Sequence, residues 1–312
     1  MPGDTLIVTN TGDTLRVPDT LFHSTEARST PSGIATDAPD NSLLFFLAIG
    51  ISLLLVAAPF LIVRSFRKFR RKKIHEEALA KVNAHYAQYD NLLAGYNGYY
   101  KSLSPALRQV FLERVVEFTE SKFFEYLDIE REEKMPLLIS AAAVQLTFGL
   151  DKFLLDFFDT IYILKHDYHY GLNATPFMGH VSKNGIYLSW DNFLKGFEDE
   201  TDGNNVGIHE MAHALAYVNF MVEDEAAKDN AFQQRFREFS AIARPVFNTM
   251  QGGETNMLGS YAATSYNEFW AVAVENFFEK SLQMKVELPQ LYLALSYLLN
   301  QDPLLAEKVL HL

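Results

Sequence analysis

The sequence predicts an α+β fold that is mainly helical with a small sheet and is preceded by a single transmembrane helix. Three observations carry this prediction. An uncharged apolar run covers residues 43–63, segments of helical character make up most of the chain after it, and two short phrases rich in β-branched and aromatic residues stand between them. A chain of 312 residues, 48% of them hydrophobic, is long enough to bury a sizeable core.

Charge and cysteine content narrow the classes of function. The whole chain has a formal net charge of -12, and from residue 74 onward 18 basic and 33 acidic residues give -15. Because such an acidic surface repels phosphate backbones, we expect no nucleic-acid binding by the folded part. The chain has no cysteine, so a disulfide framework and a thiolate zinc site are excluded. A metal must therefore be held by His, Asp or Glu.

The apolar run LLFFLAIGISLLLVAAPFLIV, residues 43–63, has the length of a membrane-spanning helix. Its 21 residues carry no charge, and at about 1.5 Å per residue they cross a hydrocarbon core of roughly 30 Å. A buried core helix fits less well because the run has no polar face. A cleaved signal peptide also fits less well, because the run is long and starts far into the chain. Residues 1–42 are rich in Thr, Ser, Asp, Pro and Gly and are predicted to form a disordered tail.

Basic residues next to this run set the predicted topology. The segment RSFRKFRRKK, residues 64–73, has seven Lys or Arg, while the preceding tail has only Arg16 and Arg28 against six acids. The excess of positive charge on the cytoplasmic side predicts a single-pass protein of the inner (plasma) membrane, with its N-terminus outside and its C-terminal bulk in the cytoplasm. The basic segment also favours contact with anionic lipid.

The remaining elements follow in order. Residues 64–104 are predicted to form a basic juxtamembrane segment and a helical stalk, because strong helix formers run from Lys73 to Leu93 and the Gly-rich stretch GYNGYYKSLSP follows. The globular domain is predicted to cover residues 105–312. Its expected elements are helices at 105–122 and 137–148, strands at 159–166 and 183–190 with an Asn-Gly turn, a helix around the motif HEMAH, a helix at 230–247, and a helical region at 267–299.

The motif HEMAH is the strongest sign of chemistry. His209 and His213 are four residues apart, so in a helix both imidazoles point from one face toward one position. Zinc peptidases need a third protein ligand and an open position for water. A third histidine in the pattern H-E-x-x-H-x-x-G-x-x-H is excluded, because Ala216 and Asn219 occupy the required positions.

A later glutamate can supply the third ligand. The candidates are Glu223, Glu225, Glu238, Glu254, Glu268, Glu275 and Glu279. Glu268 differs from the others because it opens an apolar, aromatic segment, NEFWAVAVENFFEK, that has to be buried. Ser265 and Glu268 also fit a capping box, in which the carboxylate only satisfies a backbone N–H, and composition favours neither interpretation. Tyr261, seven residues earlier, is a phenol suited to donate to a developing oxyanion.

Two further patterns have alternative interpretations. His166, His169 and His180 lie in the segment KHDYHYGLNATPFMGH, and polar or capping roles are expected for them in preference to a second metal site. The phrase at Ile186–Trp190 is either a free strand edge that pairs with an extended peptide or an ordinary half-buried strand.

Several ordered motifs resemble the Mlc titration factor A family of zinc peptidases, whose catalytic core is similar to that of anthrax lethal factor. The resemblance covers roughly residues 105–312. It is carried by the motifs AAAVQLTFGL, TIYIL, GHVSKNGIYLSWDNF, IHEMAHAL, YAATSYNEFWAVAVENFFE and LYLALSYLLNQDP. The resemblance implies a zincin-type metallopeptidase domain.

The resemblance also implies roles for individual residues. His209, His213 and Glu268 match the ligands of one Zn²⁺ per chain, Glu210 matches the general base, and Tyr261 matches the donor to the transition state. The sequence departs from some glutamate-type zinc peptidases, which place a second carboxylate four residues after the third ligand, because Val272 stands there. Glu275, on the same helix face as Glu268, is an alternative candidate to hold a ligand histidine.

These expectations combine into a membrane-anchored zinc metallopeptidase that hydrolyses peptide bonds, with aminopeptidase-like action implied by the resemblance. Its expected partners are a peptide or protein substrate and the lipid bilayer around residues 43–63. The alternative is a regulatory binding module of the same fold that sequesters a transcriptional repressor or another protein partner with little turnover. The presence of both Glu210 and Tyr261 favours the enzyme.

Overall fold

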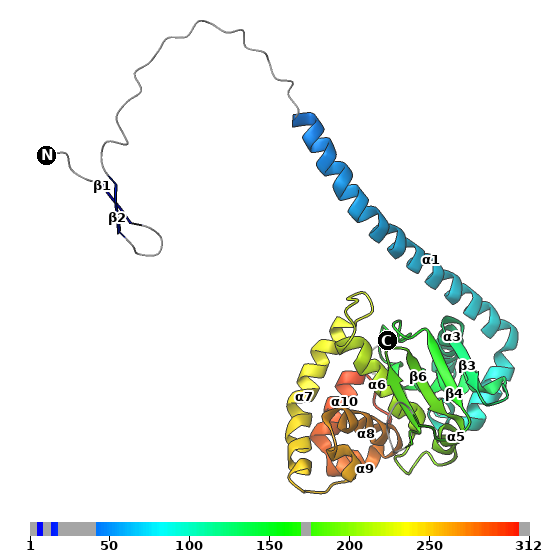
Figure 1. Cartoon of the computed structure of the whole chain (residues 1–312). Coiled ribbons are helices and arrows are strands. Elements are labelled where there is room, and N and C mark those ends of the chain that lie inside the picture. Colours follow the sequence, from blue (N-terminus) through cyan, green and yellow to red (C-terminus); the bar gives the residue numbers. More distant parts are fainter. Residues whose placement is uncertain (1–4, 9–13, 18–41, 170–175, 306–312) are drawn as a thin grey trace, which may run out of the picture. The chain divides into compact units, whose positions relative to one another are not determined.

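A computed structural model describes residues 5–8, 14–17, 42–169 and 176–305 of the chain (Figure 1). The chain divides into two compact units, Met1–Val63 and Arg64–Leu312. The long helix α1 (Ser42–Tyr96) begins in the first unit and ends in the second.

The first unit contains a short hairpin and the apolar half of α1. Strands β1 (Thr5–Val8) and β2 (Thr14–Val17) pair antiparallel, with Thr5 opposite Val17. The predicted tail therefore has local strand structure, which its Thr, Ile and Val residues favour; its other residues lie outside the described part. Within α1, the apolar segment is long and apolar enough to cross a membrane and none of it is buried.

The second half of α1 belongs to the folded unit. Ala78 and Val82, four residues apart on one helix face, are fully buried, and so is Leu93. Salt bridges join Arg67 to Asp224 and Arg71 to Asp156, and His75 lies 2.7 Å from Glu117. The compact unit thus begins at Arg64 and includes the segment predicted to form a stalk.

A four-stranded sheet has the order β3-β4-β6-β5. Its strands are β3 (Phe123–Leu127), β4 (Thr160–Leu164), β5 (Gly179–Ser182) and β6 (Gly185–Ser189). The first three in this order are parallel, and β5 runs antiparallel to β6. The sequence predicts β4 and β6, and the Asn-Gly turn, but neither β3 nor β5.

The position of β6 corrects one interpretation. This strand lies between β4 and β5, so it has no free edge, and its Ile186 and Leu188 side chains are fully buried. Trp190 already begins helix α5 (Trp190–Glu198). The free edge on this side of the sheet belongs to β5, and a proposal of peptide binding has to be based on that strand.

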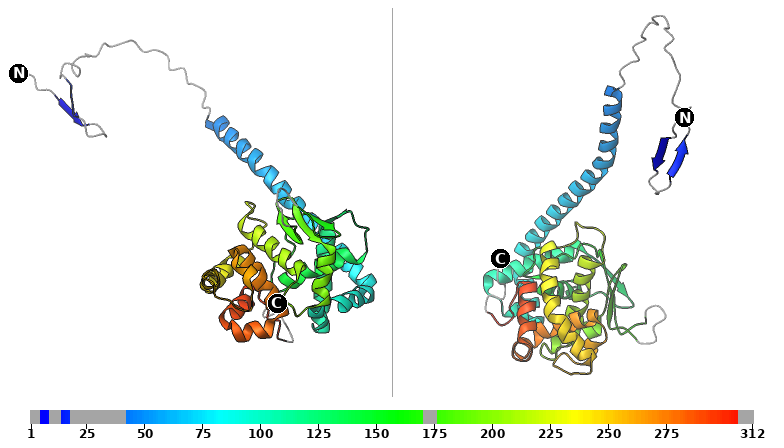
Figure 2. Two further views of the ribbon diagram at one scale, coloured as in Figure 1. Left: turned by 60° about the horizontal axis from the view of Figure 1, so that its bottom comes forward. Right: turned by 90° about the vertical axis from the view of Figure 1, so that its left-hand side faces the viewer.

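Helices pack on one face of the sheet and beyond it. They are α2 (Gly98–Lys101), α3 (Pro105–Ser121), α4 (Lys134–Thr147), α6 (Val206–Phe220), α7 (Asn230–Gln251), α8 (Tyr266–Glu279), α9 (Ser281–Glu287) and α10 (Pro289–Leu299). Helix α6 contacts β5 and β6 as well as α4 and α8, so it lies at the centre of this unit (Figures 1 and 2). The fold class is α+β and mostly helical, as predicted.

Trp270 fixes α8 against α6. Its indole Nε1 donates to the carbonyl oxygen of Ala212 at 2.9 Å, and its buried ring packs edge to face against Phe232 and Phe239 of α7. Because Trp270 is in the first turns of α8, this contact brings the start of α8 beside the middle of α6. That is where HEMAH and Glu268 meet.

Candidate metal centre

Helix α6 presents both motif histidines on one face, as their spacing predicts. The helix starts at a capped end, where the Asn205 side-chain oxygen accepts a hydrogen bond from the backbone N–H of Ile208 at 3.0 Å. The ring centroids of His209 and His213 lie 4.7 Å apart, and their Nε2 atoms face each other at 3.0 Å.

Glu268 joins these imidazoles from the first turn of α8. Its Oε2 atom lies 3.1 Å from His209 Nε2 and 3.4 Å from His213 Nε2. Ser265 does cap α8, because its hydroxyl oxygen accepts from the Glu268 backbone N–H at 3.1 Å. The Glu268 carboxylate is nevertheless directed to α6, which supports the ligand interpretation over a purely capping role.

The separations within this group fit a tetrahedral metal site. Zinc bonds of about 2.0–2.1 Å at tetrahedral angles place neighbouring ligand atoms about 3.3 Å apart, and the three separations here are 3.0, 3.1 and 3.4 Å. Among the described residues, His209, His213 and Glu268 form the only set of three His, Asp or Glu side chains whose ligand atoms all lie within 4.8 Å. Three protein ligands leave the fourth position open for a water molecule.

Glu275 supports this group from behind His209. Its Oε2 lies 3.1 Å from His209 Nδ1, and its Oε1 accepts from the Asn205 backbone N–H at 3.0 Å. When the imidazole is neutral, donation from Nδ1–H to this carboxylate leaves the Nε2 lone pair directed toward the metal position. The sequence suggests this role for Glu275. Its contact with Asn205 could not be predicted, because the sequence shows only that Asn205 is a residue type suited to cap a helix.

The group also holds a proton when no cation is bound. Burial lowers the pKa of His209, but hydrogen bonds to Glu268 and Glu275 outweigh this effect and raise it to about 10. Burial raises the pKa of Glu268, yet its bonds to the two imidazoles hold it far below its usual range. A metal ion must therefore displace a proton from His209, so that binding depends on pH.

Glu210, the predicted general base, is buried beside the metal group. Only 5% of it is exposed, and its Oε2 has no hydrogen-bond partner within the described part of the chain. Burial raises the pKa of this carboxyl to about 7, although the two histidines lower it. A β-carbon at Gly179 would lie 2.5 Å from Glu210 Cγ, so only glycine lets β5 pass this close. The sequence gives no sign of this role for Gly179.

Tyr261, the predicted transition-state donor, lies in the 3-10 helix η2 (Ser260–Ala263). Its ring centroid is 6.2 Å from that of His209, and the side chain is 57% exposed. Partial burial and the charge of Glu268 raise the pKa of Tyr261, so its hydroxyl keeps its proton at neutral pH. An exposed, protonated phenol beside His209 is able to donate a hydrogen bond to a molecule bound there.

The other histidines of the β4–β5 region make separate contacts. His166 Nδ1 lies 2.6 Å from the Asp191 carboxylate, while His180 stacks on Tyr187 with ring centroids 4.3 Å apart. The hydroxyl of Tyr168 lies 2.9 Å from His180 Nδ1. These two histidines thus do not join a second three-residue metal group among the described residues.

Comparison with known proteins extends this description. A protein of Synechocystis sp. (strain ATCC 27184 / PCC 6803 / Kazusa), named "Uncharacterized protein slr2042", is 25% identical over 224 residues, which are 66% of this chain and 81% of that protein. Residues 66–298 match the family described as glucose-regulated metallo-peptidase M90. The match includes most of the folded half of α1 and confirms the resemblance found in the motifs. Because it covers well over half of the chain, this protein belongs to the M90 family of glucose-regulated metallopeptidases.

Proposed function

We propose that the protein is a membrane-anchored, zinc-dependent peptidase with a zincin-type site. One observation carries the proposal: two imidazoles and one carboxylate converge at tetrahedral separations beside the buried Glu210, whose Oε2 has no hydrogen-bond partner among the described residues. The ligand set of two histidines and one glutamate, with an open fourth position, is one that catalytic zinc uses. Membership of a metallopeptidase family supports the same conclusion.

His209, His213 and Glu268 hold the ion in this proposal, and Glu275 holds His209 in the tautomer that presents Nε2. A bound zinc ion supplies a Lewis acid that polarises the substrate carbonyl and makes a water molecule more acidic. Glu210 accepts the proton of that water and delivers it to the leaving amine. The Tyr261 hydroxyl donates to the substrate carbonyl oxygen as negative charge develops on it.

Strand β5 positions the substrate in the same proposal. It is the last strand of the sheet, and among the described residues it pairs only with β6, which leaves its other edge open to an extended peptide. Gly179 lies in this strand and directly contacts Glu210. Backbone pairing along β5 therefore brings a peptide next to the general base.

The apolar half of α1 is the proposed membrane anchor. Its side chains are largely exposed; Val56, for example, is 77% exposed, as expected of a segment that is covered by lipid. The basic residues that follow support a topology in which the peptidase unit faces the cytoplasm. A reporter fused to the C-terminus tests this topology, and a signal from outside the cytoplasm would refute it.

The decisive experiment compares the full-length chain with Glu210→Gln. Zinc per chain is measured by atomic emission, and hydrolysis is followed by mass spectrometry on a peptide library that contains free and blocked amino termini. We expect one zinc ion in both proteins and cleavage by the wild type alone. If the peptides with free amino termini are cleaved and those with blocked amino termini are not, the protein acts as an aminopeptidase.

Two other outcomes contradict the proposal in different ways. A wild-type chain that binds no zinc refutes the metal centre itself. Stoichiometric zinc without cleavage in either protein refutes the enzyme and favours a binding module that captures a protein partner. Glu238→Gln, a substitution of an exposed glutamate on α7, serves as the matched control and should behave as wild type.

A further inference from the structure

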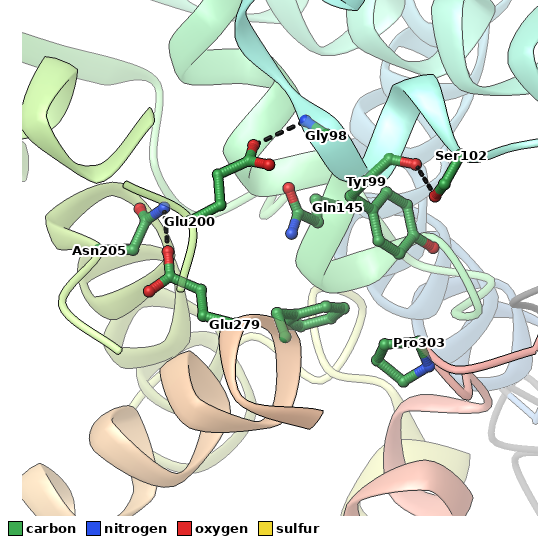
Figure 3. Close-up of a pocket in the computed structure, with 9 residues that line it drawn as sticks. Gly98, Tyr99, Ser102, Gln145, Glu200, Asn205, Glu279 and Pro303 are labelled. Atoms are coloured by element: carbon green, nitrogen blue, oxygen red, sulfur yellow. Dashed lines mark hydrogen bonds between the residues drawn. The ribbon is translucent and has the colours of Figure 1, made fainter. Parts of the chain in front are cut away.

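A pocket with a volume of about 190 Å³ lies in the folded unit, and none of His209, His213 and Glu268 lines it (Figure 3). It is bordered by α2, α4 and the end of α8, and by the segment that precedes α6. The residues used below are Glu200, Glu279, Gln145 and Phe278. Neither the metal centre nor the family assignment gives this pocket a role.

Two carboxylates, those of Glu200 and Glu279, border the pocket. Glu200 Oε1 accepts from the Gly98 backbone N–H at 2.6 Å, and Glu279 Oε1 accepts from Asn205 Nδ2 at 3.0 Å. No salt bridge to either glutamate occurs among the described residues. Burial raises the pKa of Glu200, and burial together with the charge of Glu275 raises the pKa of Glu279 to about 8. No Lys or Arg side chain lines the pocket, although the charge of nearby Lys101 partly offsets the rise in the pKa of Glu200.

Gln145 adds a hydrogen-bond donor that is directed into the same space. It is only 8% exposed, and its Oε1 is occupied by a hydrogen bond from Asn97 Nδ2 at 2.9 Å. Its amide NH₂ consequently points into the pocket, on the side between Glu200 and Glu279 (Figure 3), and finds no partner within the described ranges. Because this NH₂ group opens into the pocket, it is available to a ligand that brings a hydrogen-bond acceptor.

This donor distinguishes between classes of cation. A bare metal ion between the two carboxylates would face the positive end of the Gln145 N–H dipole and would leave that donor unsatisfied. An organic ammonium ion with a neighbouring carbonyl oxygen satisfies all three groups at once. The Phe278 ring also lines the pocket, and an aromatic face attracts an ammonium ion.

The size of the pocket sets the size of the ligand. A protein cavity of about 150 Å³ accommodates benzene, so the 190 Å³ here accommodates a molecule with a few more heavy atoms. We propose that this pocket binds a small primary ammonium compound with an adjacent carbonyl oxygen, that is, an amino acid amide or the amino end of a short peptide. The ammonium group lies between Glu200 and Glu279, and the carbonyl oxygen accepts from Gln145 Nε2.

Isothermal titration of the metal-depleted, full-length chain in detergent tests this proposal, and glycinamide is the probe. Metal removal ensures that the probe does not bind through zinc. We expect saturable binding at one site per chain. Methylamine lacks the carbonyl oxygen and acetamide lacks the ammonium group, so each should bind at least about tenfold more weakly, since charge-assisted and buried hydrogen bonds contribute that much.

Matched variants locate the binding. Glu200→Gln and Glu279→Gln should each weaken glycinamide binding at least about tenfold, because the amide keeps the shape of the side chain but cannot become the carboxylate that pairs with the ammonium group. Glu268→Gln alters the metal centre and should leave the affinity unchanged, which separates this proposal from the peptidase proposal. Circular dichroism verifies the fold of each variant. Glu200 is only partly buried, so Glu200→Gln decides the matter if Glu279→Gln does not fold.

Each remaining outcome contradicts the proposal. Absence of saturable glycinamide binding refutes the site, and affinity that neither glutamate variant changes places the probe elsewhere. Equal affinity for methylamine removes the role of Gln145. Calcium ions that bind more tightly than glycinamide, and compete with it, refute the ligand class.

Discussion

Replacement of Glu275 by glutamine tests the geometry of the metal centre most directly. The carboxylate is buried, with 4% exposed, and its two oxygens serve two N–H donors, at His209 Nδ1 (3.1 Å) and the Asn205 backbone (3.0 Å). A glutamine has only one oxygen. If that oxygen serves Asn205, the new NH₂ group faces His209 Nδ1 and favours the tautomer protonated at Nε2, which removes a metal ligand.

The expected loss follows from these contacts. Substitution of a group that orients a ligand histidine lowers metal affinity about 10- to 100-fold, which corresponds to about 1.4–2.7 kcal/mol. The assay is competition for zinc against a chromophoric chelator at fixed pH, with Glu238→Gln as the surface control. Zinc affinity within about threefold of wild type in a folded Glu275→Gln protein would refute the reasoning, because the variant loses at least one of the two contacts.

Three further predictions concern the base, the pH dependence and the core. Gly179→Ala places a β-carbon 2.5 Å from Glu210 Cγ and should reduce kcat at least about tenfold with zinc retained. In the control Gly95→Ala, the new β-carbon meets nothing within 4 Å, so full activity is expected. A Gly179→Ala kcat equal to that of the wild type would contradict the close contact between Gly179 and Glu210. Glu210 has to be ionised to accept a proton and its pKa is raised from 4.5 to about 7, so kcat/KM should fall as pH decreases, with a midpoint no higher than about 7 because a bound cation lowers this pKa; a kcat/KM that increases as pH decreases below 7 contradicts this role. Val82→Ala removes two buried methyl groups of α1 and should lower the free energy of unfolding by roughly 1–3 kcal/mol in urea titrations, whereas Val286→Ala, at a position 74% exposed, should change it by less than about 0.5 kcal/mol.

Local sequence patterns were sufficient to predict most of the helices and the two histidines. The spacing of His209 and His213 determines that they share a helix face, and Asn205 begins that helix at a capped end. Glu268 could not be selected from composition alone, because its distance from α6 depends on how α8 packs. The Trp270 contact with Ala212 determines that packing, and it joins residues 58 positions apart.

The undetected elements are short or depend on tertiary contacts. Strand β5 has four residues, and Gly179 within it gives no strand signal of its own. Strand β3 follows α3 almost directly, so the change from helical to strand spacing of the apolar residues is hard to recognise in the sequence. The pocket around Gln145 is assembled from segments distant in the sequence, and no local pattern indicates it.

Glu275 has a consequence beyond the orientation of one ligand. The same carboxylate accepts from the first turn's cap, Asn205, and from His209, so loss of the ion at the imidazoles alters a group that also fixes the start of α6. Amide hydrogen exchange at Val206 to Ile208 should accordingly change when the ion is chelated, because His209 then takes up a proton and its contact with Glu275 becomes an ion pair. The beginning of this helix would then act as a built-in reporter of cation occupancy, readable without any substrate.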